Sequence, residues 1–84
     1  MDSYLFQKKC KETLIDYFRA VYNMETEIED FYVVWSCKAL QNNKVLISTD
    51  KVDDGFYAEF TRNGNEEETY MDIYYKKINK VVSI

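Results

Sequence analysis

The chain has 84 residues, 17% aromatic side chains and a formal net charge of −4, with two cysteines, no proline and no histidine. A chain of this length supports one domain with a single core, which buries roughly 60 to 65% of the unfolded surface. The acidic balance argues against binding to nucleic-acid phosphates or anionic lipid, because both depend on clustered lysine and arginine. No apolar run approaches the roughly 18 residues of a membrane span and no signal-peptide pattern is present, so we expect a cytoplasmic protein.

The first predicted element is an amphipathic helix over about Tyr4 to Tyr22, which Asp2 or Ser3 can cap. Apolar side chains recur at steps of three and four, which predicts one buried face. The acidic connection 24–30 follows as a loop or short turn anchored by Ile28. The apolar positions of the helix are Phe6, Cys10, Leu14, Tyr17, Phe18 and Val21.

Two β-rich apolar runs predict a central hairpin, with strands over 31–37 and 44–49 joined by the turn Gln41-Asn42-Asn43. Period-two alternation assigns one face of the first strand to the core. We expect both cysteines to be small core residues without a reactive role, since neither has a base or an electropositive neighbourhood. The core face of the first strand holds Phe31, Val33, Trp35 and Cys37.

An alternating run over 56–62, the Asn63-Gly64 pair and a further run to about Tyr75 predict a second hairpin. With this pair as a two-residue turn, Phe56 faces Met71 across the strands. The inner face then holds Phe56, Ala58, Phe60, Thr69, Met71, Ile73 and Tyr75. The outer face holds Tyr57, Glu59, Thr61, Glu66, Glu68, Tyr70, Asp72 and Tyr74.

The end of the chain fits either a helical stripe or a short strand, and its β-branched residues favour a turn over 76–80 and an edge strand over 81–84. The predicted fold class is α+β, a single domain over 1–84 with one N-terminal helix packed on a four-stranded antiparallel sheet (α-β-β-β-β). An exposed edge at 44–49 or 81–84 leaves a homodimer by strand addition open.

The residues indicate no catalytic or metal site. The absence of histidine removes the commonest general base and the commonest metal ligand. The acidic turn with Asp50, Asp53 and Asp54 lacks the spacing of a calcium loop. The paired carboxylates of the second hairpin lack the cleft that acid-base work on a glycoside needs. We therefore expect no enzyme, no cofactor and no metal ion.

The most distinctive surface is the second hairpin, because residues 50–75 hold eight acidic and two basic side chains together with several tyrosines. Tyrosine supplies rigid contact area and carboxylates select a basic partner, so the hairpin predicts a protein-binding surface. The same residues fit an interpretation in which cross-strand tyrosine pairs only stabilise the sheet. The candidate binding residues are Tyr57, Glu59, Glu66, Glu67, Glu68, Tyr70, Asp72 and Tyr74.

Several segments of the chain match a family pattern. Residues 33–44 read VVWSCKALQNNK and continue through Leu46 and Ser48, the Asp54-Gly55 pair precedes an aromatic strand, and 70–72 follow the Asn63-Gly64 turn. In these segments the chain resembles an uncharacterised family of short phage and prophage proteins of Firmicutes. The resemblance implies no known activity and no site residues. It implies a context, since small accessory phage genes often encode inhibitors of bacterial defence, including anti-CRISPR proteins.

The leading hypothesis is therefore a non-enzymatic phage accessory protein in the cytoplasm of a bacterial host. It would bind a host protein with a basic surface and inhibit a CRISPR or other immune effector. A second hypothesis is a small-molecule or nucleotide binder, with Trp35 and tyrosines lining a pocket between helix and sheet. A third is a phage structural or morphogenesis factor. Direct binding to nucleic acid or to a membrane is not expected.

Overall fold

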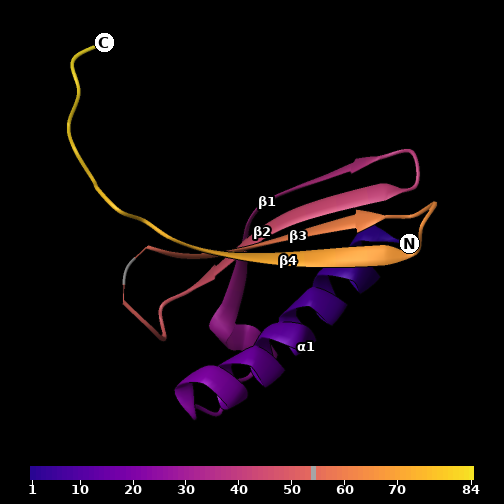
Figure 1. Ribbon diagram of the computed structural model, residues 1–84, viewed down its shortest axis with the longest axis horizontal. Coiled ribbons are helices and arrows are strands. Elements are labelled where there is room, and N and C mark those ends of the chain that lie inside the picture. The colour runs from indigo at the N-terminus through magenta and orange to yellow at the C-terminus, as the bar shows by residue number, and fades with distance from the viewer. Residues whose placement is uncertain (54) are drawn as a thin grey trace.

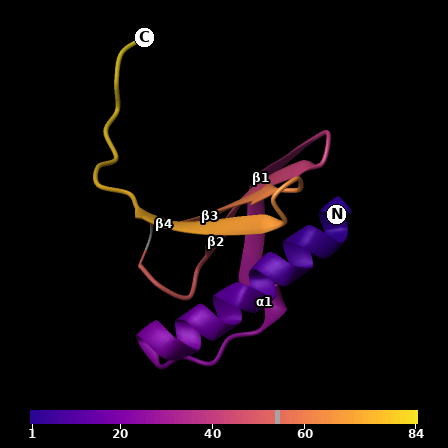
Figure 2. The same cartoon turned by 45° about the vertical axis from the view of Figure 1, so that its right-hand side comes forward.

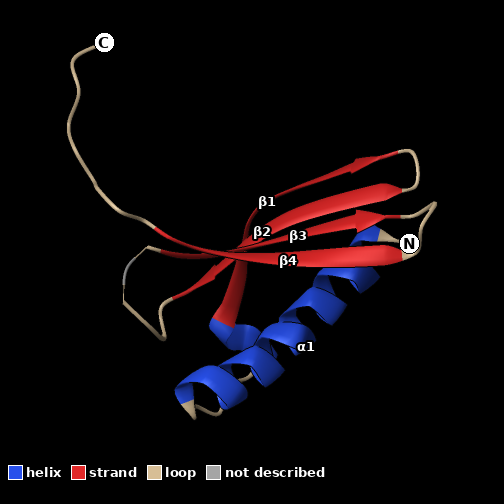
Figure 3. Ribbon diagram, in the orientation of Figure 1, coloured by secondary structure: helices blue, strands red, loops and turns tan. Residues whose placement is uncertain are grey.

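One helix lies against one face of a four-stranded antiparallel sheet, as Figures 1 and 3 show. The computed structural model describes residues 1–53 and 55–84. The strands follow one another in the sheet in chain order, so the predicted α+β class and order of elements are confirmed. The elements are helix α1 (Ser3–Tyr22), the short 3-10 helix η1 (Ile28–Asp30), and strands β1 (Phe31–Ala39), β2 (Asn42–Thr49), β3 (Phe56–Asn63) and β4 (Glu68–Tyr75).

Helix α1 begins after Asp2, whose side-chain oxygen accepts a hydrogen bond from the Tyr4 backbone N–H at 3.1 Å. It ends at Asn23, which adopts the left-handed conformation with a φ of 52°. The predicted buried face is confirmed, although Val21 in the last turn is exposed. The four buried side chains of the helix are Phe6, Cys10, Leu14 and Phe18.

The core lies between α1 and the inner face of the sheet, and Phe18 is at its centre. The Phe18 ring meets the rings of Phe31 and Phe56 edge to face, each at a centroid distance of 5.2 Å. Such pairs stabilise a core beyond the area that they bury. The sheet completes this core with Val45, Ile47, Ala58 and Phe60.

The first hairpin has a shorter turn than predicted. Leu40 and Gln41 alone connect β1 to β2, and Leu40 adopts a positive φ of 57°, as a two-residue hairpin turn requires. Asn42 and Asn43, predicted to be turn residues, instead begin β2. Asn43 is buried, and its side-chain amide donates a hydrogen bond to the Met1 carbonyl oxygen at 3.4 Å.

A β-bulge at Val34 changes the face that the rest of β1 presents. Val33 pairs with Ile47 of β2, but Trp35 pairs with the next residue, Leu46, so β1 contains one extra residue. The extra residue reverses the alternation, and Trp35 turns away from the helix. The prediction that Trp35 lies in the core is therefore wrong, and its side chain is 45% exposed.

The two cysteines differ in accessibility. Cys10 is buried as predicted, and this burial raises the pKa of its thiol to about 12. Cys37 follows the bulge and is exposed, which corrects its predicted place in the core.

Iodoacetamide at about pH 8 is therefore expected to add one group to the native protein, at Cys37, because the reagent needs an accessible thiolate. Intact-mass spectrometry checks the result, and urea should allow the second adduct. Two adducts on the native protein would contradict the burial of Cys10.

The second hairpin pairs in a register four residues away from the predicted one. Phe56 pairs with Tyr75 and not with Met71, because the loop spans the four residues 64–67 and not the Asn63-Gly64 pair alone. The shift is an even number of residues, so the side chains that lie within β3 and β4 keep their predicted faces, whereas Glu66, predicted on the outer face, lies in the loop.

Hydrogen bonds to the Asn63 side chain account for the longer loop. Its side-chain oxygen accepts the backbone N–H groups of Asn65 and Glu66, at 3.0 and 3.4 Å. Glu67 then closes the loop with a positive φ of 54°. These local bonds favour a four-residue loop over the two-residue turn that an Asn-Gly pair usually signals.

The tips of the two hairpins touch each other. The Gly64 N–H donates a hydrogen bond to the side-chain oxygen of Asn42 at 3.1 Å, and the side chains of Gln41 and Asn65 are also hydrogen-bonded. A Cβ atom at Gly64 would lie 2.2 Å from the Gln41 carbonyl oxygen. Only glycine fits there, because any side chain would push the two tips apart.

Residues 76–84 form neither helix nor strand, so the predicted edge strand over 81–84 is wrong. The Lys76 N–H still donates to the Gly55 carbonyl oxygen at 2.7 Å, and the chain then leaves the sheet (Figure 1). No strand of the described residues pairs with residues 76–84.

Candidate functional site

The sheet face opposite α1 is open, as Figure 2 shows, and we call it the outer face. Cross-strand pairs span it from edge to edge: Trp35 pairs with Leu46, Leu46 with Glu59, and Glu59 with Asp72. No other helix or strand of the described residues covers these pairs. The outer face is formed by Tyr32, Trp35, Cys37, Lys44, Leu46, Tyr57, Glu59, Thr61, Glu68, Tyr70, Asp72 and Tyr74.

The structure brings most of the predicted binding residues together on this face. Six of them are contributed by β3 and β4, namely Tyr57, Glu59, Glu68, Tyr70, Asp72 and Tyr74. Glu66 and Glu67 lie in the loop between these strands and are exposed. All eight therefore lie on β3, β4 or the loop that joins them.

Trp35 and Cys37 are residues of this face that sequence reasoning placed in the core, and Trp35 is the larger of the two. Strict alternation placed it with the core, and only the bulge at Val34 turns it outward. Val34 lies within a continuous apolar run and carries no local mark of a bulge, such as a glycine. The sequence therefore contains no signal that could have identified Trp35 as a surface residue.

The charges of the outer face are unevenly distributed. At its centre, the Lys44 ammonium lies 3.6 Å from a carboxylate oxygen of Glu59, which partly neutralises both groups. The Tyr70 hydroxyl donates to Glu68 at 2.5 Å, and this hydrogen bond is the main reason why the pKa of Tyr70 is raised.

Carboxylates without a cationic neighbour gather at the β4 side of the sheet. Within residues 1–53 and 55–84, no salt bridge involves any member of this group. We call the group the acidic edge, and it consists of Glu66, Glu67, Glu68 and Asp72. The acidic edge gives the β4 side of the outer face a negative potential.

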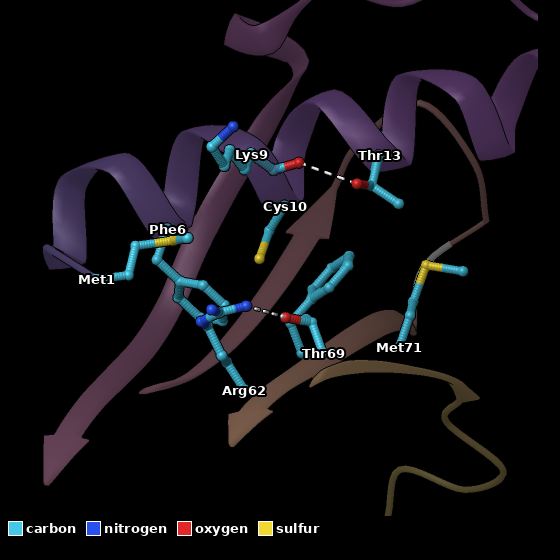
Figure 4. A pocket seen from close by; sticks show the side chains of 9 residues that line it. Met1, Phe6, Lys9, Cys10, Thr13, Arg62, Thr69 and Met71 are labelled. Atoms are coloured by element: carbon cyan, nitrogen blue, oxygen red, sulfur yellow. Dashed lines mark hydrogen bonds between the residues drawn. The ribbon is translucent and has the colours of Figure 1, made fainter. Parts of the chain in front are cut away.

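A groove of about 210 Å³ lies on the other side of the sheet, between α1 and strands β3 and β4 (Figure 4). At its rim, the Arg62 guanidinium donates to the Thr69 hydroxyl at 3.3 Å. The predicted pocket between helix and sheet thus exists, but neither Trp35 nor a tyrosine lines it, which corrects that prediction. Its apolar lining includes Phe6, Phe60 and Met71.

The described residues contain no group of three His, Cys, Asp or Glu side chains that could hold a metal ion, and Asp54 of the acidic turn lies outside them. No helix in the described part of the chain is long and apolar enough to cross a membrane.

The hydroxyls of Tyr22 and Tyr75 are hydrogen-bonded to each other, which joins the end of α1 to the end of β4.

These features define a class of small α+β protein, in which a helix covers one face of an antiparallel meander and the other face stays open, aromatic and acidic at one side. The model of a family of unknown function (DUF6275) matches residues 7–84, and the chain belongs to this family. Comparisons with curated proteins and with solved structures give no match. Membership of an uncharacterised family, which the sequence resemblance implied, is thereby confirmed.

Proposed function

We propose that this protein acts by binding another protein through its outer face and performs no chemistry of its own. The observation that carries the proposal is the exposure of large side chains on a face that α1 does not cover. Tyr70 is 56% exposed, Tyr74 51%, Tyr32 48% and Trp35 45%. Exposed aromatic side chains on one open face are typical of protein interfaces, in which tyrosine and tryptophan contribute much of the binding energy.

The acidic edge supports a partner with a basic surface. Two of its carboxylates, Glu68 and Asp72, alternate along β4 with the exposed rings of Tyr70 and Tyr74, so a basic partner gains both attraction and contact area. A single-stranded nucleic acid would also stack on a sheet of aromatic rings, but its phosphates would be repelled by these carboxylates.

Within this class, we infer an inhibitor of a bacterial immune effector, such as a CRISPR nuclease. The support is the resemblance of the chain to short phage and prophage proteins of Firmicutes, together with the acidic edge. An acidic surface of this kind could occupy the basic channel in which an effector holds its nucleic acid. The protein would then act in the cytoplasm of the host.

Charge reversal at Glu66, Glu67 and Glu68, each to lysine, is the test of this proposal. All three side chains are exposed, so the fold should survive and circular dichroism should be unchanged. Binding to the partner should weaken by about 100-fold, which is roughly 2.7 kcal/mol, because attraction becomes repulsion. The wild type and the variant serve as baits in pull-downs from the host, and titration calorimetry then measures affinity for the captured protein.

A matched control reverses three exposed carboxylates outside the outer face, at Glu12, Glu27 and Glu29. Both variants change the net charge equally. A difference in affinity between them would therefore come from the position of the charges and not from the total charge. Equal affinities for the two variants, or full binding by the Glu66, Glu67 and Glu68 variant, would reject the acidic edge as the binding surface.

A further inference from the structure

The chain after β4 projects from the domain (Figures 1 and 2). The apolar side chains of this segment are exposed. Ile78 is 72% exposed, Val82 62% and Val81 96%. β-branched residues of this kind favour an extended strand that is covered on at least one face. We call residues 76–84 the tail, which in this conformation exposes apolar surface that a partner strand could cover.

The neighbouring strand β4 has a free edge. It is the last strand of the sheet, and no strand of the described residues pairs with its other side. The Lys76 backbone N–H donates to the Gly55 carbonyl oxygen at 2.7 Å, so Lys76 directs its backbone groups toward the β3 side. Every second residue of an antiparallel strand bonds to the same neighbour, so the even-numbered residues of β4 direct their N–H and C=O groups toward β3. The antiparallel alternation then directs the backbone groups of Met71, Ile73 and Tyr75 outward, where an added strand could bond them.

The tail and this edge are complementary in charge. The tail contains three lysines and no acidic residue. The acidic edge beside β4 contains four carboxylates, of which Asp72 and Glu68 lie on β4 itself. If the tail is extended in line with β4, its even-numbered residues continue the outer face, so Lys80 lies on the same face as Asp72.

We propose that the tail of one copy adds as a fifth strand to the β4 edge of a second copy, and that the exchange is reciprocal. The two chains pair antiparallel about a two-fold axis at Lys76. Lys80 then lies opposite Asp72 of the other copy, Ile78 opposite Tyr74, and Val82 opposite Tyr70. The dimer has closed two-fold symmetry, so it does not extend into a fibre.

This register places Ile78 and Val82 beside aromatic rings and pairs opposite charges. Aromatic rings beside β-branched side chains, and lysine beside aspartate, are stabilising cross-strand pairs. The two Lys76 side chains meet at the axis and form one repulsive pair. The dimer contains two attractive Asp72–Lys80 pairs, so attraction between charges exceeds repulsion. Folding back onto β4 of the same chain would need a turn, and residues 76–84 form no turn in the structure.

The dimer does not depend on the proposed function. The exchange uses the β4 edge, and Trp35 and Tyr32 of each copy remain on the part of the outer face formed by the first hairpin. A chain that ends at Tyr75 should therefore be a monomer that still binds the host protein. Loss of dimerisation and loss of host binding are thus separate results.

A charge-swap experiment tests the dimer. Asp72→Lys and Lys80→Glu each replace two attractive pairs by two repulsive ones, so each variant alone should dissociate at about tenfold higher concentration. Mixed in equal amounts, they should form a heterodimer with attractive pairs at both sites, and the double variant in one chain should dimerise like the wild type. Sedimentation equilibrium measures each mass, and circular dichroism confirms that each variant is folded.

Three results would overturn the proposal. The wild type could remain monomeric at concentrations up to about 1 mM. The chain that ends at Tyr75 could dimerise as well as the full chain, which would place the interface elsewhere. The mixture of Asp72→Lys and Lys80→Glu could associate no better than either variant alone, which would exclude the Asp72–Lys80 pairing.

Discussion

Phe18→Ala is expected to remove about 3 to 5 kcal/mol from the free energy of unfolding, because it deletes the central ring of the core and leaves a cavity. Phe18 is fully buried, and its ring meets Phe31, Phe56 and Tyr22 at centroid distances of 5.2, 5.2 and 4.8 Å. A domain of this length has a total stability of about 4 to 13 kcal/mol. The loss is therefore a large fraction of the total, and the variant should unfold at a much lower urea concentration than the wild type.

Urea unfolding followed by circular dichroism measures this loss. Phe18→Leu is the graded control, since it keeps part of the volume and should lose less stability than the alanine variant. Val21→Ala in the same helix changes an exposed side chain and should stay within about 0.5 kcal/mol of the wild type. A loss below about 1 kcal/mol for Phe18→Ala would show that the aromatic cluster is not the centre of the core.

Periodicity was sufficient to predict the elements and the inner face. The helical spacing of Phe6, Cys10, Leu14 and Phe18 identified the buried stripe of α1, and alternation identified the inner side of β3. These signals are reliable because each element must present an apolar face to the core, and that face is formed by many residues along the element. One local irregularity does not remove such a pattern.

Turns, bulges and unpaired segments depend on a few local atoms, and there the predictions were wrong. The Asn63 side chain accepts two backbone N–H groups and so selects a four-residue loop, which the Asn-Gly pair alone does not reveal. The bulge at Val34 has no marker in its residue types. The segment predicted as a strand over 81–84 has the right composition, but no strand of the described residues pairs with it.

The residues of the candidate surface were also predicted correctly where they depend on alternation and wrongly where they depend on a local irregularity. The register of the second hairpin was shifted by an even number of residues, so Tyr57, Tyr70 and Tyr74 remained on the outer face. A shift by one would have buried them. The outward orientation of Trp35 depends on the bulge, so the sequence did not predict it, although Trp35 adds the largest side chain to the face.

Trp35→Ala is expected to weaken binding of the host protein by at least about 30-fold, roughly 2 kcal/mol, while the fold survives. Tryptophan is the residue most enriched among the side chains that dominate interfaces, and Trp35 stands beside Leu46 in the row that crosses the outer face. It is also the single tryptophan of the chain, so its emission reports on this site alone. Binding should shift that emission to shorter wavelength in the wild type, because the partner removes water from the ring.

The matched control is Tyr4→Ala, which removes a ring that is 74% exposed on α1, away from the outer face. It should bind like the wild type, since the loss of a ring elsewhere changes neither the outer face nor the acidic edge. Trp35→Ala binding within about threefold of the wild type would contradict the outer face as the interface, as would unchanged tryptophan emission on binding. Because the bulge at Val34 is what turns Trp35 outward, a loss confined to Trp35→Ala would mean that this irregularity serves recognition and not packing.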